Sequence, residues 1–191
     1  MKPKPQDLLP KLRLSLMPFS ISPTEIPEVL LITYQRFPDE RGYFAELYKS
    51  SSLPFLEVRQ VNMSFSRKGV VRGLHYQLKP FEQGKLVTVL QGRILDLALD
   101  IRLGSPTYGK FVTREITPGL MLWVPPGFAH GFQALEESTV VYFTSKEYSP
   151  AHERCVHYLD LGIRWPLDAI VNRKDSSCPP LSQAENNFSY P

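Results

Sequence analysis

The segment from residue 94 to residue 101 constrains the fold most strongly, because apolar side chains recur in it at every second position. One set of alternate positions carries four large aliphatic side chains, Leu95, Leu97, Leu99 and Ile101. The set between them carries Asp96, Ala98 and Asp100. Since successive side chains of a strand point to opposite faces, this period predicts a strand with one packed face and one face that lines a cavity.

Similar short apolar runs, separated by turn residues, continue from about residue 28 to residue 144. Six glycines mark the breaks: Gly42, Gly69, Gly84, Gly92, Gly104 and Gly119. With 18 Pro and 11 Gly in 191 residues and no long helical period, the chain is predicted to be all-β. One short helix is expected around Leu167 to Val171.

The length of the chain fits one domain, and a hydrophobic content of 42% is enough to build a core. Prolines interrupt the first residues, so we expect a loosely ordered N-terminal extension over residues 1–20. The folded domain is expected over residues 21–175. Polar residues dominate the end of the chain, and residues 176–191 are expected to form a polar C-terminal tail.

Charge and cysteine usage narrow the class of protein. The net charge of +3 is spread along the chain, which disfavours nucleic-acid binding and suits a small anionic ligand. Cys155 and Cys178 lack CxxC spacing, so we expect two free thiols and a cytoplasmic location. The apolar runs are too short to span a membrane or to form the core of a signal peptide.

Two histidines and a lysine stand in contexts that suit proton transfer. His75 lies in the apolar run Val71–Gln77, and Lys85 opens the next run. A neutral imidazole can take a proton beside a carbonyl, and an ammonium can stabilise the oxyanion that forms. His130 follows a Pro-Pro-Gly turn between aromatic residues. A lone histidine on an apolar strand is more often structural, so the residues alone leave both interpretations open.

Tyr142 belongs to another predicted strand. It shares a face with Val140 and Thr144. Its phenol either points into the same cavity or packs as an ordinary core tyrosine, and the sequence does not distinguish the two.

Two stretches resemble the sequence motifs of the cupin superfamily. The first has Gly69 and His75 at the motif's spacing, but Gln77 stands where a second histidine would bind metal. The second stretch has four residues at the spacing of the second cupin motif: Gly119, Pro125, Gly127 and His130. The resemblance implies a cupin-type jelly-roll β-barrel with short C-terminal helical segments. The neutral amide in place of one imidazole implies a site without metal.

From Ile26 to Asp175 the chain resembles the dTDP-4-dehydrorhamnose 3,5-epimerase family more closely. Besides the stretches around His75 and His130, five blocks occur in the family's order: Asp39–Phe44, Gln60–Asn62, Asp100–Arg102, Ser105–Gly109 and Gly162–Pro166. The resemblance implies an isomerase that inverts carbons 3 and 5 of a 4-keto-6-deoxy sugar carried on dTDP, through enolates, in dTDP-L-rhamnose biosynthesis. It implies no cofactor.

The same resemblance implies four catalytic residues. His75 corresponds to the general base, and Asp175 corresponds to the carboxylate that orients its imidazole. Lys85 corresponds to the lysine beside the keto oxygen, where an ammonium favours the enolate. Tyr142 corresponds to the tyrosine that returns a proton to the opposite face of the sugar.

Substrate-binding residues are implied in the same way. Arg72 and His130 correspond to diphosphate and sugar contacts, and Asp96 corresponds to an acidic group that holds Lys85. Three residues correspond to the lining of the nucleotide site: Gln60, Asn62 and Tyr148. Tyr148 either stacks on thymine or is a plain surface aromatic. An edge-strand set reaches the nucleotide across the interface of a homodimer, and it comprises Arg41, Phe44 and Glu46.

Arg72 and His75 set a geometric condition on this assignment. They differ in parity and would face opposite sides of a regular strand. We therefore predict a bulge or bend at Gly73. A regular strand from Arg72 to Gln77 would count against placing both side chains in one site.

Three other functions stay open on the sequence. A monoepimerase that inverts only carbon 3 or only carbon 5 would carry nearly the same residues. A metal-dependent cupin oxygenase is opposed by Gln77. A non-catalytic sugar-nucleotide binder is opposed by the presence of His75, Asp175 and Tyr142 together.

Overall fold

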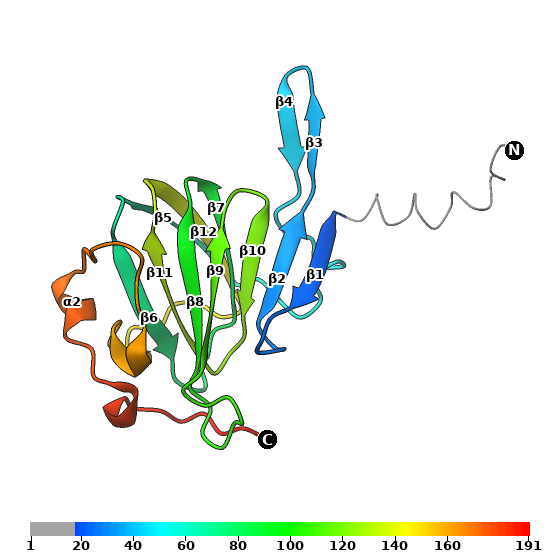
Figure 1. Ribbon diagram of the computed structural model, residues 1–191. Helices are drawn as coiled ribbons and strands as arrows, with labels where there is room; N and C mark the ends of the chain where they lie inside the picture. The colour runs from blue at the N-terminus through cyan, green and yellow to red at the C-terminus, as the bar shows by residue number, and fades with distance from the viewer. Residues whose placement is uncertain (1–17) are drawn as a thin grey trace, which may run out of the picture.

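The structure, a computed structural model, describes residues 18–191 (Figure 1). Its strands are β1 (Phe19–Pro23), β2 (Leu30–Tyr34), β3 (Arg36–Asp39), β4 (Gly42–Ala45), β5 (Gln60–Ser66), β6 (Val71–Gln77), β7 (Lys85–Gln91), β8 (Ile94–Asp100), β9 (Phe111–Ile116), β10 (Leu120–Val124), β11 (Phe128–Ala134), β12 (Ser138–Thr144) and β13 (Glu153–Cys155). Short helical segments follow: the 3₁₀ turns η2 (Asp160–Gly162) and η3 (Leu181–Gln183), and the α-helical turn α2 (Arg173–Ser176). Among the described residues, none of the helices is long and apolar enough to cross a membrane.

The strands form two facing antiparallel sheets. Their order is β1-β2-β10-β7-β12-β5 in the six-stranded sheet and β13-β6-β11-β8-β9 in the five-stranded sheet. The hairpin of β3 and β4 pairs with neither sheet and projects beyond them (Figure 1). The predicted all-β fold, a cupin-type jelly roll with short C-terminal helical segments, is confirmed.

Alternating side chains of the strands build separate apolar layers. Between the sheets, Val87 and Val140 belong to one cluster with Ala98 of β8. Leu97 and Leu99, which flank Ala98 in sequence, pack on the other side of the five-stranded sheet, under the C-terminal segment. The alternation along β8 thus separates two faces, as the sequence predicted, but the second face is not a cavity lining: Ala98 packs in the core, and Asp96, Ala98 and Asp100 line neither of the two cavities described below.

The helix expected around Leu167 to Val171 does not form. The Ile170 N–H donates to the Gly69 carbonyl at 2.9 Å, and the Val71 N–H donates to the Ile170 carbonyl at 3.0 Å. These bonds hold the segment extended beside the start of β6. Since they join residues about one hundred positions apart, the local sequence could not reveal them.

The division of the chain into extension, domain and tail stays a prediction. Residues 1–17 of the expected extension lie outside the described residues, and β1 begins at Phe19. In the expected tail, Leu181 and Phe188 are buried against the outer layer of the five-stranded sheet. The C-terminal segment therefore covers one face of the barrel despite its polar composition.

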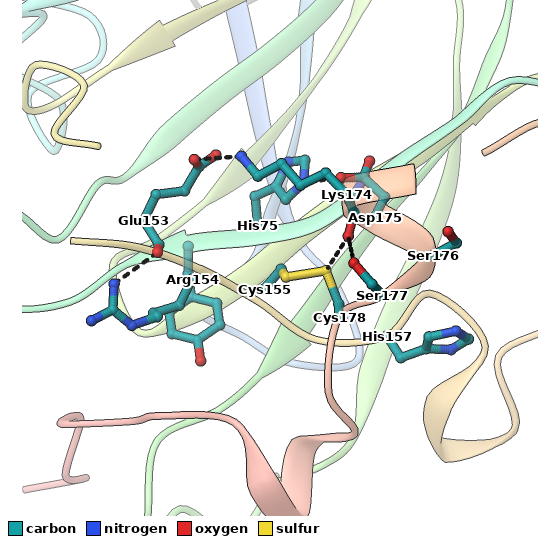
Figure 2. Close-up of a disulfide and its surroundings, with 12 residues drawn as sticks. His75, Glu153, Arg154, Cys155, His157, Lys174, Asp175, Ser176, Ser177 and Cys178 are labelled. Atoms are coloured by element: carbon teal, nitrogen blue, oxygen red, sulfur yellow. Dashed lines mark hydrogen bonds and ion pairs between the residues drawn. A yellow bond between two sulfur atoms is a disulfide. The ribbon is translucent and has the colours of Figure 1, made fainter. Parts of the chain in front are cut away.

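The expectation of two free thiols was wrong, because Cys155 and Cys178 form a disulfide (Figure 2). The bond joins β13 to the chain just after α2, across a sequence separation of 23. By the chain-entropy estimate, closing a loop of this length stabilises the fold by about 3 kcal/mol. Spacing alone could not show the bond, since only the fold brings the two Cα atoms to 5.6 Å.

The bulge predicted at Gly73 is confirmed. His130 of β11 pairs with His75, whereas Phe132 pairs with Arg72, so β6 has one residue more than β11 between these pairs. Gly73 has φ +128°, a conformation that glycine adopts without steric cost. Arg72 and His75 consequently line the same cavity.

A test of this bulge is the substitution Gly73→Ala. A Cβ at Gly73 would lie 2.5 Å from the Gly131 Cα, so backbone must move. Gly104→Ala is the matched control, because Gly104 has φ +84° but open space around its Cα. Chemical denaturation should show Gly73→Ala to be less stable than Gly104→Ala by about 2 kcal/mol or more. Equal losses would mean that only the dihedral angle matters at Gly73.

Candidate active site

Two adjoining cavities of about 290 and 240 Å³ lie between the sheets. Four side chains line both of them: His75, Lys85, Tyr142 and Glu153. These side chains come from β6 and β13 of the five-stranded sheet and from β7 and β12 of the six-stranded sheet. The two cavities therefore form one site with two halves and a shared centre.

His75 contacts the carboxylate of Asp175 on α2. Its Nε2 lies 2.8 Å from Oδ1, and Oδ2 accepts from the Gly73 N–H at 3.1 Å. Burial acts to raise the pKa of Asp175, but the hydrogen bond with His75 and its charge lower that pKa below the usual value. An ionised carboxylate at this place favours the imidazole tautomer with the proton on Nε2 and leaves Nδ1 as the proton acceptor.

Lys85 extends from β7 towards β6, and its Nζ donates to the His75 carbonyl at 3.3 Å. Burial lowers the pKa of Lys85 to about 8, although the negative charges of Glu153 and Asp96 act to raise it. At neutral pH the ammonium is thus the main form, held in a partly dry site. Such a group can stabilise an oxyanion strongly.

Tyr142 approaches the centre of the site from the sheet opposite His75. It lies on β12, between β7 and β5, whereas His75 lies on β6 of the other sheet. Burial raises the pKa of the Tyr142 phenol, and the charge of Arg72 opposes this rise. The phenol therefore keeps its proton at neutral pH and can act as a donor from that wall.

Amide groups line one half of the site. Gln60 Nε2 donates to Asn62 Oδ1 at 2.7 Å, and the Tyr148 N–H donates to Gln60 Oε1 at 2.8 Å. Tyr148 is 49% exposed and lines the same cavity. The structure thus brings together the three residues expected to line a nucleotide site.

An arginine and a second histidine line the other half. Arg72 Nε donates to Ser66 Oγ at 2.9 Å, and His130 Nε2 lies 2.6 Å from Asp96 Oδ1. Asp96 was expected to hold Lys85, but its partner is His130. Its charge acts on Lys85 only at longer range. Asp96 Oδ2 is buried and makes no hydrogen bond within residues 18–191.

The edge-strand set does not reach this cavity within one chain. Arg41 and Phe44 line a separate surface hollow on the hairpin of β3 and β4. Arg41 Nη2 lies 2.5 Å from Asp39 Oδ2, and Lys49 Nζ lies 3.9 Å from Glu46 Oε1. A role for Arg41, Phe44 and Glu46 in nucleotide binding stays a prediction.

Glu153 is a site residue that the sequence reasoning missed. Its Oε2 accepts from the Tyr148 hydroxyl at 2.8 Å and from Lys174 Nζ at 2.5 Å. Burial acts to raise the pKa of Glu153, but the hydrogen bonds from Lys174 and Tyr148 lower it. No local pattern marks this glutamate, because it reaches the site only through the pairing of β13 with β6.

Gln77 has a structural use at the position where the cupin motif has a histidine. Its Nε2 donates to the Phe81 carbonyl at 2.7 Å, and its Oε1 accepts from the Ser149 N–H at 2.7 Å. The amide thereby joins two loops at the rim of the site. An imidazole could not supply both contacts with the same geometry.

Comparisons with known proteins agree with this geometry. The family model described as dTDP-4-dehydrorhamnose 3,5-epimerase matches residues 23–183. A relative of that name from Sinorhizobium fredii is 44% identical over 177 residues, which cover 86% of this chain and 91% of the relative.

Solved structures of two epimerases are similar to most of this chain. The crystal structure of the dTDP-4-dehydrorhamnose 3,5-epimerase from Sulfolobus tokodaii is 52% identical, with a TM-score of 0.85 and coverage of 88% of this chain and 98% of that one. A dTDP-6-deoxy-D-glucose-3,5-epimerase from Legionella pneumophila, solved with dTDP-4-keto-L-rhamnose, is 40% identical, with a TM-score of 0.81 and coverage of 86% and 94%.

The low pKa of Lys85 predicts how stability depends on pH. The folded chain binds fewer protons than the unfolded chain between about 8 and 10.5, so the free energy of unfolding gains from Lys85 as pH rises through this window. Lys85→Met should therefore be more stable than the wild type near pH 7, on the order of 2 kcal/mol, and this advantage should shrink towards pH 10. Urea titrations measure it, with the exposed Lys110→Met as control. Equal stability of Lys85→Met and wild type near pH 7 would mean that burial does not lower the pKa of Lys85.

Proposed function

The chain belongs to the dTDP-4-dehydrorhamnose 3,5-epimerase family, and we propose that it inverts ring carbons 3 and 5 of a dTDP-linked 4-keto-6-deoxy sugar. The observation that carries this proposal is the placement of two proton-transfer groups, His75 and Tyr142, on opposite sheets around one cavity. Inversion of a carbon requires proton removal from one face and proton return to the other, and this arrangement supplies both.

The first step is removal of a proton next to the ketone. His75 Nδ1 takes the proton. The C–H electron pair forms a double bond to the carbonyl carbon, and the π pair of the ketone moves to its oxygen, which gives the enolate. Asp175 stabilises the imidazolium that results, because its ionised carboxylate accepts from Nε2. The carboxylate itself stays ionised.

The developing charge of the enolate lies on the keto oxygen. Lys85 provides an ammonium in the shared centre of the site. A fixed positive charge in a partly buried place interacts more strongly with the enolate than with the neutral ketone, so it lowers the barrier.

The second step is proton return from the other wall. The Tyr142 phenol gives its proton to the same ring carbon, and the enolate collapses to the inverted ketone. Exchange with water then restores the phenol and the neutral imidazole. Carbons 3 and 5 both adjoin the ketone, so the same groups serve both positions.

The two halves of the site suit the two ends of the substrate. Arg72 gives one half a fixed positive charge, and together with His130 this half fits the diphosphate and the sugar. Gln60 and Asn62 supply amide groups for the thymine, and Tyr148 presents an exposed ring for stacking. Asp96 orients His130 through its hydrogen bond.

We propose that the working form is a homodimer. On the edge strand β5, Asn62 and Ser64 line the cavity, whereas the alternate residues point outward. These outward side chains are apolar and more than half exposed: Val61, Met63 and Phe65. Such a face on an edge strand marks a protein interface. In the dimer, the projecting hairpin would bring Arg41, Phe44 and Glu46 to the nucleotide of the partner.

We keep the cytoplasm as the proposed location, on the ground that the substrate is a nucleotide-activated sugar. The Cys155–Cys178 disulfide weighs against it, because cytosolic thiols are generally kept reduced. Alkylation of thiols during lysis, followed by mass spectrometry, distinguishes the two redox states of the protein in its own cell.

NMR of dTDP-4-keto-6-deoxyglucose in deuterated water tests the function directly. The protein should introduce deuterium at ring carbons 3 and 5, and a downstream reductase should trap the product as dTDP-rhamnose. Exchange at one carbon only would identify a monoepimerase. Failure of exchange at both carbons would contradict the proposal and favour a binding protein.

His75→Ala tests the base. Loss of the imidazole should lower the exchange rate at both carbons by about a thousandfold, because His75 is the imidazole that Asp175 orients. Affinity for dTDP, measured by calorimetry, should change less than threefold. His157→Ala, which removes an imidazole outside the cavity, is the control. Exchange near the wild-type rate in His75→Ala would remove His75 from this role.

Tyr142→Phe separates the two steps. The variant keeps the ring in place but cannot return a proton, so deuterium exchange with retention should continue while inversion slows by about a hundredfold. The measurement compares isotope incorporation with the yield of trapped product. Equal loss of exchange and inversion would mean that proton removal and proton return do not use separate groups on the two faces of the sugar.

Met63→Glu tests the dimer. A carboxylate in the middle of the outward β5 face should shift the wild-type dimer to monomer in sedimentation velocity. Leu103→Glu, at a residue of 50% exposure outside β5, should leave the dimer intact. A wild-type monomer, or a dimer unaffected by Met63→Glu, would contradict the interface.

A further inference from the structure

The turn α2 carries the carboxylate of the site yet has little to keep it in place. It spans four residues, and Asp175 is the buried one. The Asn172 side chain caps it by accepting from the Asp175 N–H at 2.7 Å. A single helical turn without an apolar face is not stable alone. Its position therefore depends on its ties to the barrel.

The polar ties of α2 run through groups of the site itself. Asp175 binds Gly73 and His75, and Lys174 pairs with Glu153 at 2.5 Å (Figure 2). The Lys174 side chain is 57% exposed in this pair and the Glu153 side chain is 18% exposed, so solvent screens the charge of Lys174 in part. A proton on His75 or an anionic ligand also changes the charges at these contacts. The hydrogen bonds of Asp175 and the Lys174–Glu153 pair therefore depend on the charges in the site, whereas a covalent bond does not.

The Cys155–Cys178 disulfide is a covalent tie at the same junction (Figure 2). Cys155 lies directly opposite His75 in the pairing of β13 with β6. Cys178 follows α2, and its N–H donates to the Asp175 carbonyl at 3.4 Å. The bond thus connects the backbone beside the base to the backbone beside its carboxylate.

We propose that the Cys155–Cys178 disulfide positions Asp175 against His75, so that its reduction slows proton transfer without weakening nucleotide binding. The inference rests on the function proposed above. The sulfur atoms take no part in the reaction and act only through Asp175.

The redox step is ordinary thiol–disulfide exchange. A dithiol reductant gives two electrons and two protons, the S–S bond breaks, two thiols form on the protein, and the reductant becomes a disulfide. Cys155 is partly exposed and Cys178 is 6% exposed. Attack from solvent is therefore easiest at the Cys155 sulfur.

The test compares the oxidised protein with protein reduced by dithiothreitol and then desalted, using the deuterium-exchange assay. Reduction should lower kcat at least tenfold, since a misplaced catalytic group costs rate steeply. The Kd for dTDP should stay within threefold, and reoxidation should restore kcat. The double variant Cys155→Ser, Cys178→Ser should match the reduced protein and should not respond to dithiothreitol.

A double-mutant comparison shows whether the effect passes through Asp175. In the Asp175→Asn background, reduction should change kcat less than twofold, because the ionised carboxylate that the disulfide holds against His75 is already absent. If reduction instead disturbed the structure in general, it would lower kcat by the same factor in Asp175→Asn as in the wild type.

Each other outcome overturns the inference in a distinct way. Equal kcat for oxidised and reduced protein, or a multiplied loss in Asp175→Asn, removes the positioning role while the proposed function stands. Loss of the β-sheet circular dichroism signal on reduction would assign the disulfide to the fold. Oxidised protein without any exchange would overturn the proposed function itself.

Discussion

A single buried carboxylate fixes the relation between the C-terminal segment and the five-stranded sheet. Asp175 is 1% exposed, and its two oxygens bind the Gly73 N–H and the His75 ring. A buried charge is stable only when it is paired and hydrogen-bonded. Both partners lie on the part of β6 where the bulge at Gly73 shifts the register against β11. The base, the bulge and the return of the chain near residue 175 therefore depend on one another.

Inversion also requires a proton donor on the opposite side of the sugar from the base, and the jelly roll provides it on the second sheet. Lys85 and Tyr142 lie on neighbouring strands of the six-stranded sheet, opposite the strand of His75. Farther along β7 and β12, Val89 and Val140 pack between the sheets. The polar groups thus lie where the apolar core ends, so the same strands that build the core also hold the reacting groups at a fixed separation.

The sequence predicted those features of the fold and the site that depend on local patterns or on family motifs. Alternation along β8 predicted that its side chains divide between two faces, but not that the face with Ala98 packs into the core. The parity of Arg72 and His75 predicted the bulge. The disulfide was missed because two cysteines without a motif say nothing about pairing. Glu153 was missed because it enters the site through a three-residue edge strand. Asp96 was placed beside Lys85, since no local signal distinguishes that lysine from His130 as its partner.

The most direct measurement of the central claim is the tautomer of His75, read from long-range ¹H–¹⁵N NMR spectra of histidine-labelled protein and assigned with His75→Asn. In the neutral imidazole we predict a proton on Nε2 and a bare Nδ1, and this preference should weaken in Asp175→Asn. A proton on Nδ1 in the wild type, or an unchanged preference in Asp175→Asn, would contradict it.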